Sequence, residues 1–281
     1  MNKRINSIFV LTRPVNLLIA FISVWAAAIV AGEIYFSLRI IAASFSAALI
    51  AAYGNAVNDI FDLKTDKINK QFRPLPSGAL TRSEASIAAL IFAVTGISIS
   101  FYIGYLATAV AFAAVILLTL YTPVFKGYLF VGNIVVAFVS SLAFVYGGIA
   151  VGKPIGAFIP AIFAFLLHLG REMVKDVQDI IADRESGIRT GASIDNSETA
   201  RMMAGGVFIL LVIATVIPFL TDHYQLAYFL TVVLGVDLVL IISALKLFQT
   251  DDPEIMRKIA VWLKVAMPIG LLAVLLGSRG F

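Results

Sequence analysis

The sequence lacks cysteine and has few charged residues. Without cysteine there is no disulfide framework, no thiolate metal site and no thiol nucleophile. Charged residues make up 14% of the 281 positions and hydrophobic residues make up 60%. A soluble domain usually has about 25% charged residues, so a chain this apolar is better explained as a polytopic membrane protein.

Apolar stretches divide the chain into regular segments. A helix needs about 20 predominantly apolar residues to cross a bilayer. Stretches of suitable length lie at 15–32, 38–57, 83–101, 104–122, 129–150, 155–174, 199–220, 225–247 and 258–276. The sequence therefore predicts an all-α, polytopic membrane protein with nine transmembrane helices. We expect a single domain that spans residues 1–281.

The basic residues are distributed unevenly between the two ends of these predicted helices. Eighteen of the 21 lysines and arginines fall at the N-terminus or near the loops after the second, fourth, sixth and eighth helices. The other side has Arg39, Lys153 and Arg279. Because cytoplasmic loops carry an excess of Lys and Arg, the pattern predicts a multi-pass protein of the cell membrane. Its N-terminus is expected in the cytoplasm and its C-terminus on the opposite side.

Two short segments concentrate aspartates at the cytoplasmic ends of predicted helices. The first stripe is Asp59, Asp62 and Asp66, and the second stripe is Asp176, Asp179 and Asp183. On a helix, positions at these spacings share a face, where like charges repel one another. A divalent cation is the physical reason to collect them, because Mg²⁺ prefers carboxylate oxygens together with substrate phosphates. The two stripes are therefore candidate ligands for Mg²⁺.

The motifs around both stripes resemble those of the UbiA superfamily of intramembrane prenyltransferases. The family's N-x-x-x-D-x-x-x-D pattern falls on Asn58, Asp62 and Asp66, and an Arg-Pro-Leu-Pro-Ser-Gly run follows at 73–78. Its second pattern, D-x-x-x-D, falls on Asp179 and Asp183. The segment Tyr121-Thr122-Pro123, with Lys126 nearby, is similar to the family's segment after the fourth helix. One departure is Gly191-Ala192-Ser193, where family members often continue with Leu-Pro.

This resemblance implies an enzyme that moves a polyprenyl group from its diphosphate to a lipophilic acceptor, with Mg²⁺ as cofactor. It also implies that the helices surround a central cavity open to the cytoplasmic side. The implied metal ligands are Asn58, Asp62, Asp66, Asp179 and Asp183, and the spacing of the two stripes adds Asp59 and Asp176 as candidate ligands. The implied catalytic residues are Asp62, Asp179, Arg73, Lys126 and Tyr121. The implied diphosphate and substrate contacts are Arg13, Asn16, Lys67, Arg184 and Arg189.

Two short segments resemble one branch of the family and so favour one class of acceptor. Segments 54–59 and 175–179 look most like the archaeal-type branch that makes ether lipids, which joins geranylgeranyl diphosphate to geranylgeranylglyceryl phosphate. Prenylation of an aromatic ring in quinone or chlorophyll-type synthesis is the alternative within the family. The expected partners are these lipophilic substrates and membrane lipid, with no nucleic acid.

A cation-coupled transporter is the alternative of another class, because the stripes lie 117 residues apart and transporters often contain repeats. Transport sites lie near the bilayer midplane, whereas these aspartates lie at the ends of predicted helices. A prenyltransferase is therefore the favoured prediction.

Overall fold

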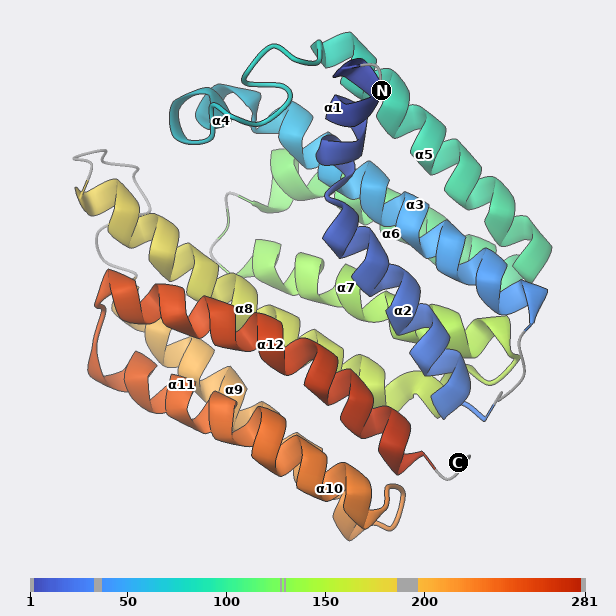
Figure 1. The fold of residues 1–281 in the computed structure, drawn as a ribbon, viewed down its shortest axis with the longest axis vertical. Helices are drawn as coiled ribbons and strands as arrows, with labels where there is room; N and C mark the ends of the chain where they lie inside the picture. The colour runs from blue at the N-terminus through green and yellow to red at the C-terminus, as the bar shows by residue number, and fades with distance from the viewer. Residues whose placement is uncertain (1–2, 33–36, 127, 129, 186–196, 279–281) are drawn as a thin grey trace. The chain divides into compact units, whose positions relative to one another are not determined.

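A computed structural model describes residues 3–32, 37–126, 128, 130–185 and 197–278 (Figure 1). Every regular element in these residues is a helix, which confirms the all-α prediction. The elements are α1 (Lys3–Thr12), α2 (Pro14–Val30), α3 (Leu38–Phe61), α4 (Leu63–Asn69), α5 (Arg82–Ile103), α6 (Tyr105–Leu120), η1 (Tyr121–Phe125), α7 (Val131–Ala150), η2 (Pro154–Ala157), α8 (Phe158–Glu185), α9 (Ser197–Leu220), α10 (Leu226–Val232), η3 (Val233–Asp237), α11 (Leu238–Gln249) and α12 (Pro253–Gly277).

The long helices correspond to the predicted membrane spans. Within the described residues, eight helical segments are long and apolar enough to cross a membrane. A ninth is obtained if α1 and α2, which are bent by 50° where they join, count as one span. The protein is therefore a multi-pass membrane protein, with eight or nine candidate spans where the sequence predicts nine.

Two helix ends differ from the predicted ones. The helix α8 continues to Glu185, although the apolar stretch that predicts it ends at 174. The helix α3 ends at Phe61, and α4 begins two residues later at Leu63. Hydrophobicity marks the part of a helix that lies in the bilayer, but charged residues of good helical propensity can extend the helix beyond it. The second stripe is consequently helical throughout, whereas the first stripe crosses a break.

The described chain divides into two compact units. One unit contains residues 1–135 and 142–158, and the other contains residues 136–141 and 159–281. The first stripe belongs to the first unit and the second stripe belongs to the second unit. A single domain and a central cavity between the helices stay predictions.

In the first unit, α3 packs along α2, α5 and α6 (Figure 1). Buried hydrogen bonds reinforce this packing: the hydroxyl of Ser46 donates to the Gly96 carbonyl over 2.7 Å and lies 2.9 Å from the Tyr146 hydroxyl. Three helices thus share one polar contact inside an apolar environment, where water cannot replace it.

In the second unit, α9 packs along α11 and α10 packs along α12. The buried carboxylate of Asp237 lies in the π-helical turn η3, and the Thr215 hydroxyl is 3.1 and 3.2 Å from its two oxygens. The Tyr228 hydroxyl donates to the Thr215 carbonyl over 2.7 Å. An ionisable residue within a membrane helix is costly, and here it is used to join α9 to η3.

Glycine allows a close backbone approach between α2 and α7 in the first unit. A Cβ atom at Gly147 would lie 2.2 Å from the Val24 carbonyl oxygen and 2.8 Å from the Ala27 Cβ. Small residues of this kind let membrane helices pack closely without a hydrophobic driving force.

We therefore expect Gly147→Ala to destabilise the protein by about 1–3 kcal/mol, because the added methyl group overpacks the α2–α7 contact. Thermal unfolding in detergent measures the effect. Gly206→Ala is the matched control, because a Cβ there would meet no heavy atom within 4 Å. Equal melting temperatures for the two variants would contradict the proposed packing constraint.

Candidate functional site

The first stripe lies at the end of α3 and continues through the break into α4. Asp62 is the residue between these helices, yet its backbone N–H still bonds to the Asn58 carbonyl over 2.9 Å. The Asp66 N–H bonds to the Asp62 carbonyl over 2.8 Å. The hydrogen-bond pattern of a helix is kept at these positions, so all three aspartates project from one continuous stretch of backbone.

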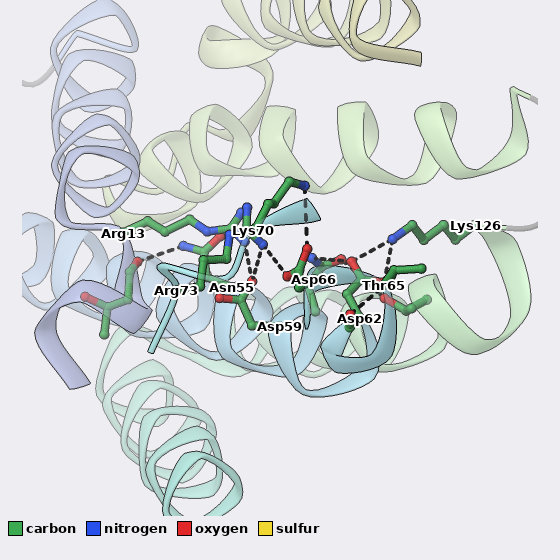
Figure 2. A network of polar contacts seen from close by, with 12 residues as sticks. Arg13, Asn55, Asp59, Asp62, Thr65, Asp66, Lys70, Arg73 and Lys126 are labelled. Atoms are coloured by element: carbon green, nitrogen blue, oxygen red, sulfur yellow. Dashed lines mark hydrogen bonds and ion pairs between the residues drawn. The ribbon is translucent and has the colours of Figure 1, made fainter. Parts of the chain in front are cut away.

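An arginine cluster, defined as Arg13, Arg73, Asp59 and Asp66, forms on one side of this stretch (Figure 2). Both Arg13 Nη2 and Arg73 Nη1 donate to Asp59 Oδ1, the latter over 3.1 Å. Arg73 Nη1 also donates to Asp66 Oδ2 over 2.7 Å. The two carboxylate side chains are only 4% and 5% exposed. Their charges are therefore compensated by arginines rather than by water.

The backbone at the α1–α2 junction determines where Arg13 lies. Arg13 has φ 55° and ψ 73°, a left-handed conformation that residues other than glycine rarely adopt. Pro14 follows at the start of α2 and disfavours the right-handed helical conformation for the residue before it. The Asn55 side chain donates to the Thr12 carbonyl over 2.8 Å and so fixes the end of α1. Asn55 and Asp59, one turn apart on α3, thus contact consecutive residues of the junction.

Arg73 is positioned by an ordered turn after α4. Its N–H bonds to the Lys70 carbonyl and its carbonyl accepts from the Ser77 N–H, each over 3.0 Å. Leu75 and Leu80, only 4% and 2% exposed, pack into the apolar cluster beneath the turn. The Arg-Pro-Leu-Pro-Ser-Gly run therefore directs the arginine toward the aspartates while its leucine anchors the turn.

A lysine occupies the other side of the first stripe (Figure 2). Lys126 Nζ lies 2.5 and 2.6 Å from the two oxygens of Asp62. The Asn58 side chain donates to Asp62 Oδ2 over 3.0 Å and accepts from the Thr122 hydroxyl over 3.3 Å. Thr122 and Pro123 belong to η1, a π-helical turn of a kind that often occurs at functional sites. The structure thus brings Lys126 to the stripe, and it adds Thr122, which the sequence reasoning did not select.

Three further residues of the first unit that the sequence predicts as site residues differ in how exposed they are. Asn16 and Lys67 are exposed. Tyr121 is half-buried at the start of η1, and its ring lies close to Gly132 of α7. The Lys70 ammonium is 3.7 Å from Asp66 and adds a further positive charge to the arginine cluster. Lys70 could have been recognised from its spacing, because it follows Asp66 by four residues.

The second stripe is carried by α8 in the second unit. Asp176 is half-buried and Asp179 is exposed. One turn earlier, the buried Glu172 accepts from Arg171 over 2.9 Å and from Lys175 over 2.6 Å. The side chains of Asp183 and Arg184, and all of Arg189, lie outside the described residues. The approach of the second stripe to the first therefore stays a prediction.

The donor atoms of both stripes suit a hard divalent cation, because they are carboxylate and amide oxygens. Within the described residues, however, no three acidic or histidine side chains converge in a way that could hold a metal ion. In the first stripe the reason is visible, since each carboxylate is paired with a lysine or an arginine. A metal ion could bind there only if some of these pairs exchange for others.

The profile of the UbiA prenyltransferase family matches residues 19–266, and the chain belongs to that family. It is therefore a membrane prenyltransferase, as the motifs predict.

Two proteins of the same name are similar to this chain over nearly its whole length. The digeranylgeranylglyceryl phosphate synthase of Methanosphaera stadtmanae is 31% identical over 266 residues, which cover 95% of this chain and 97% of that protein. The synthase of the same name from Thermococcus sibiricus is 32% identical over 270 residues, 95% of each chain.

Solved structures confirm the fold. A structure from a study of digeranylgeranylglyceryl phosphate synthase in membranes matches with a TM-score of 0.81 and 28% identity, over all of both chains. A UbiA homologue from Archaeoglobus fulgidus, bound to GPP and Mg²⁺, matches with a TM-score of 0.65 over 95% of this chain and 99% of that one. Its identity is 18%, so this likeness shows the shared fold.

The arginine cluster should contribute strongly to stability. In Arg73→Gln, the buried carboxylates of Asp59 and Asp66 lose a shared partner, which we expect to cost about 3 kcal/mol. Arg4→Gln is the control, because Arg4 pairs with Glu84 on the surface and is 73% exposed. An exposed pair contributes little, so this variant should melt near the wild-type temperature. Indistinguishable melting of the two variants in detergent would show that the cluster does not support the fold.

Proposed function

We propose that this enzyme transfers a geranylgeranyl group from its diphosphate to geranylgeranylglyceryl phosphate, in ether lipid synthesis. The observation that carries the proposal is the similarity to digeranylgeranylglyceryl phosphate synthases over nearly the full length of both chains. In the reaction, the bond between the allylic carbon and the diphosphate oxygen breaks. An ether bond to the acceptor hydroxyl forms, and that hydroxyl loses its proton.

The cationic side chains around the first stripe would bind the diphosphate of the donor. Arg13, Arg73 and Lys126 come from three separate parts of the first unit and converge on three aspartates. Guanidinium and ammonium groups form charge-assisted hydrogen bonds with phosphate oxygens. The Tyr121 hydroxyl, Asn16 and Lys67, with Arg184 and Arg189 of the second unit, are proposed as further contacts to substrate.

Mg²⁺ is the proposed cofactor, and the residues that would hold it are Asn58, Asp62, Asp66, Asp176, Asp179 and Asp183. The A. fulgidus homologue bound to GPP and Mg²⁺ supports this assignment. Asp59, the seventh candidate from the sequence, is assigned instead to the two arginines that it contacts. The metal would offset negative charge that develops on the diphosphate leaving group. Since carboxylates of the first stripe are already paired with cations, diphosphate would have to take over those cations before Asp62 and Asp66 could turn to a metal.

The function is tested with purified protein, Mg²⁺ and radiolabelled geranylgeranyl diphosphate. Geranylgeranylglyceryl phosphate should be prenylated, whereas 4-hydroxybenzoate and a naphthoate should not. Product formed only on an aromatic acceptor would replace the ether-lipid proposal with aromatic-ring prenylation. No product on any acceptor would reject both.

Asp62→Ala and Asp179→Ala should each reduce turnover to background, because one stripe alone lacks ligands for a diphosphate bridged by metal. Both variants should remain monodisperse in detergent, which shows that folding is intact. Near wild-type turnover in either variant would refute a site that depends on both stripes.

The site is proposed to face the cytoplasm, with the N-terminus on the same side, on the basis of the asymmetry of Lys and Arg. Ser77 lies in the turn that positions Arg73, and the chain contains no native cysteine to interfere. In Ser77→Cys, an impermeant thiol reagent should label membranes opened on the cytoplasmic side but not intact cells. Labelling of intact cells would reverse the orientation.

A further inference from the structure

Adjacent residues at the end of α3 contact different parts of the first unit. Successive residues of an α-helix are rotated by about 100°, so the neighbours Asn58 and Asp59 point in different directions. Asn58 contacts Asp62 and Thr122, on the side of η1 and Lys126. Asp59 contacts Arg13 and Arg73, on the side of the α1–α2 junction (Figure 2). The aspartates are therefore not equivalent members of one metal site.

Like Asp66, whose side chain is 5% exposed, Asp59 has an environment that opposes metal binding. Its side chain is 4% exposed, compared with 13% for Asp62. One of its oxygens, Oδ1, accepts from two guanidinium groups that belong to different segments. A metal ion that displaced both arginines from this oxygen would leave the part-buried Arg13 without its recorded partner, which is unfavourable, whereas Arg73 would keep Asp66.

Arg13 and Arg73 have N–H donors that their hydrogen bonds to the aspartates do not use. A guanidinium group has five N–H donors in a planar arrangement. Within the described part of the chain, the recorded contacts of Arg13 use Nη2, and those of Arg73 use Nη1. The side chains are 33% and 22% exposed, so neither arginine is fully enclosed by the protein. Such a fixed pair suits an anion with several oxygens, such as diphosphate.

We propose that Asp59 is a positioning residue and not a metal ligand: it holds Arg13 and Arg73 so that their remaining N–H groups bind the diphosphate. This inference rests on the proposed function and revises the metal assignment that the spacing of the first stripe suggests for Asp59. Arg13 and Arg73 depend to different extents on Asp59 for their position. Arg73 is also held by Asp66, whereas the recorded side-chain contact of Arg13 in the described residues is with Asp59. Loss of the Asp59 carboxylate should therefore act chiefly through Arg13.

The first measurement is the affinity for inorganic pyrophosphate with Mg²⁺, by titration calorimetry on the full chain in detergent. A hydrogen bond to a charged group contributes about 1.5–3 kcal/mol, so Asp59→Asn and Arg13→Gln should each weaken binding about tenfold or more. The double variant should bind no weaker than Arg13→Gln alone, to within about twofold, because residues that act as a unit are not additive. Independent, multiplying losses would overturn the positioning role.

The second measurement is the binding of Mn²⁺ to the protein by electron paramagnetic resonance, at a pyrophosphate concentration that saturates each variant. The double variant Asp59→Asn with Arg13→Gln removes one charge of each sign, so the local net charge is unchanged. It should bind Mn²⁺ within about twofold of the wild type. Asp62→Asn is the comparison and should bind about tenfold or more weakly, as expected when a ligand is lost. An equal loss of Mn²⁺ in the double variant would make Asp59 a ligand.

If Asp59→Asn does not fold, Arg13→Gln and Arg13→Lys test whether the guanidinium group of Arg13 binds pyrophosphate. Both should weaken pyrophosphate binding, because lysine keeps the ion pair with Asp59 but lacks the planar donor group. Unchanged pyrophosphate affinity in both would overturn the inference. These probes contain no prenyl group, so a wrong choice of donor or acceptor would not affect them. Wild-type protein that bound no pyrophosphate would instead overturn the proposed function, and the inference with it.

Discussion

The compensation of buried negative charge organises the first unit of this protein. Asp59 and Asp66 are buried and Asp62 is half-buried at a helix end, and an unpaired buried carboxylate is costly. Their cationic partners come from the α1–α2 junction, from the turn after α4 and from the residue after η1. Each of these elements has an irregular backbone, and each must adopt its own conformation for the charges to meet. The ion pairs thus add to the apolar packing, in which Leu11, Leu75 and Leu80 already form one core cluster with residues of α3.

On the proposed function, the same ion pairs would prepare the site for an anionic substrate. Without substrate, the carboxylates hold the cations in place and so reduce the conformational entropy that binding must remove. A diphosphate can then replace carboxylate oxygens with phosphate oxygens around the same guanidinium and ammonium groups. On the proposed function, Asp62 and Asp66 would become available to a metal ion in this exchange, whereas Asp59 would keep its arginines. Binding of diphosphate and binding of metal would consequently favour each other, since each removes an opposing partner of the other.

Sequence reasoning succeeded where information is local. Apolar stretches of membrane-spanning length predicted the helices, and the spacing of aspartates identified the residues around which cations gather. It failed where the determining partner is distant in sequence. Nothing in the neighbourhood of Asp59 indicates that Arg13, 46 residues earlier, will be its partner. Likewise, the left-handed backbone of Arg13 depends on the surrounding contacts, and the helical extension of α8 to Glu185 lies beyond the apolar signal.

The two stripes share a spacing but not a local structure. The first crosses a break between α3 and α4 and is followed by an ordered turn that returns Arg73 to the aspartates. The second lies within the single helix α8, where Lys175 and Arg171 of the same helix pair with the preceding Glu172. Copies of one structural repeat would be expected to conserve such features, as transporters built from repeats do. The 117-residue offset is therefore better explained by a common requirement for carboxylate spacing than by duplication of a unit. The match to the prenyltransferase family over residues 19–266 decides against a transporter independently of this offset.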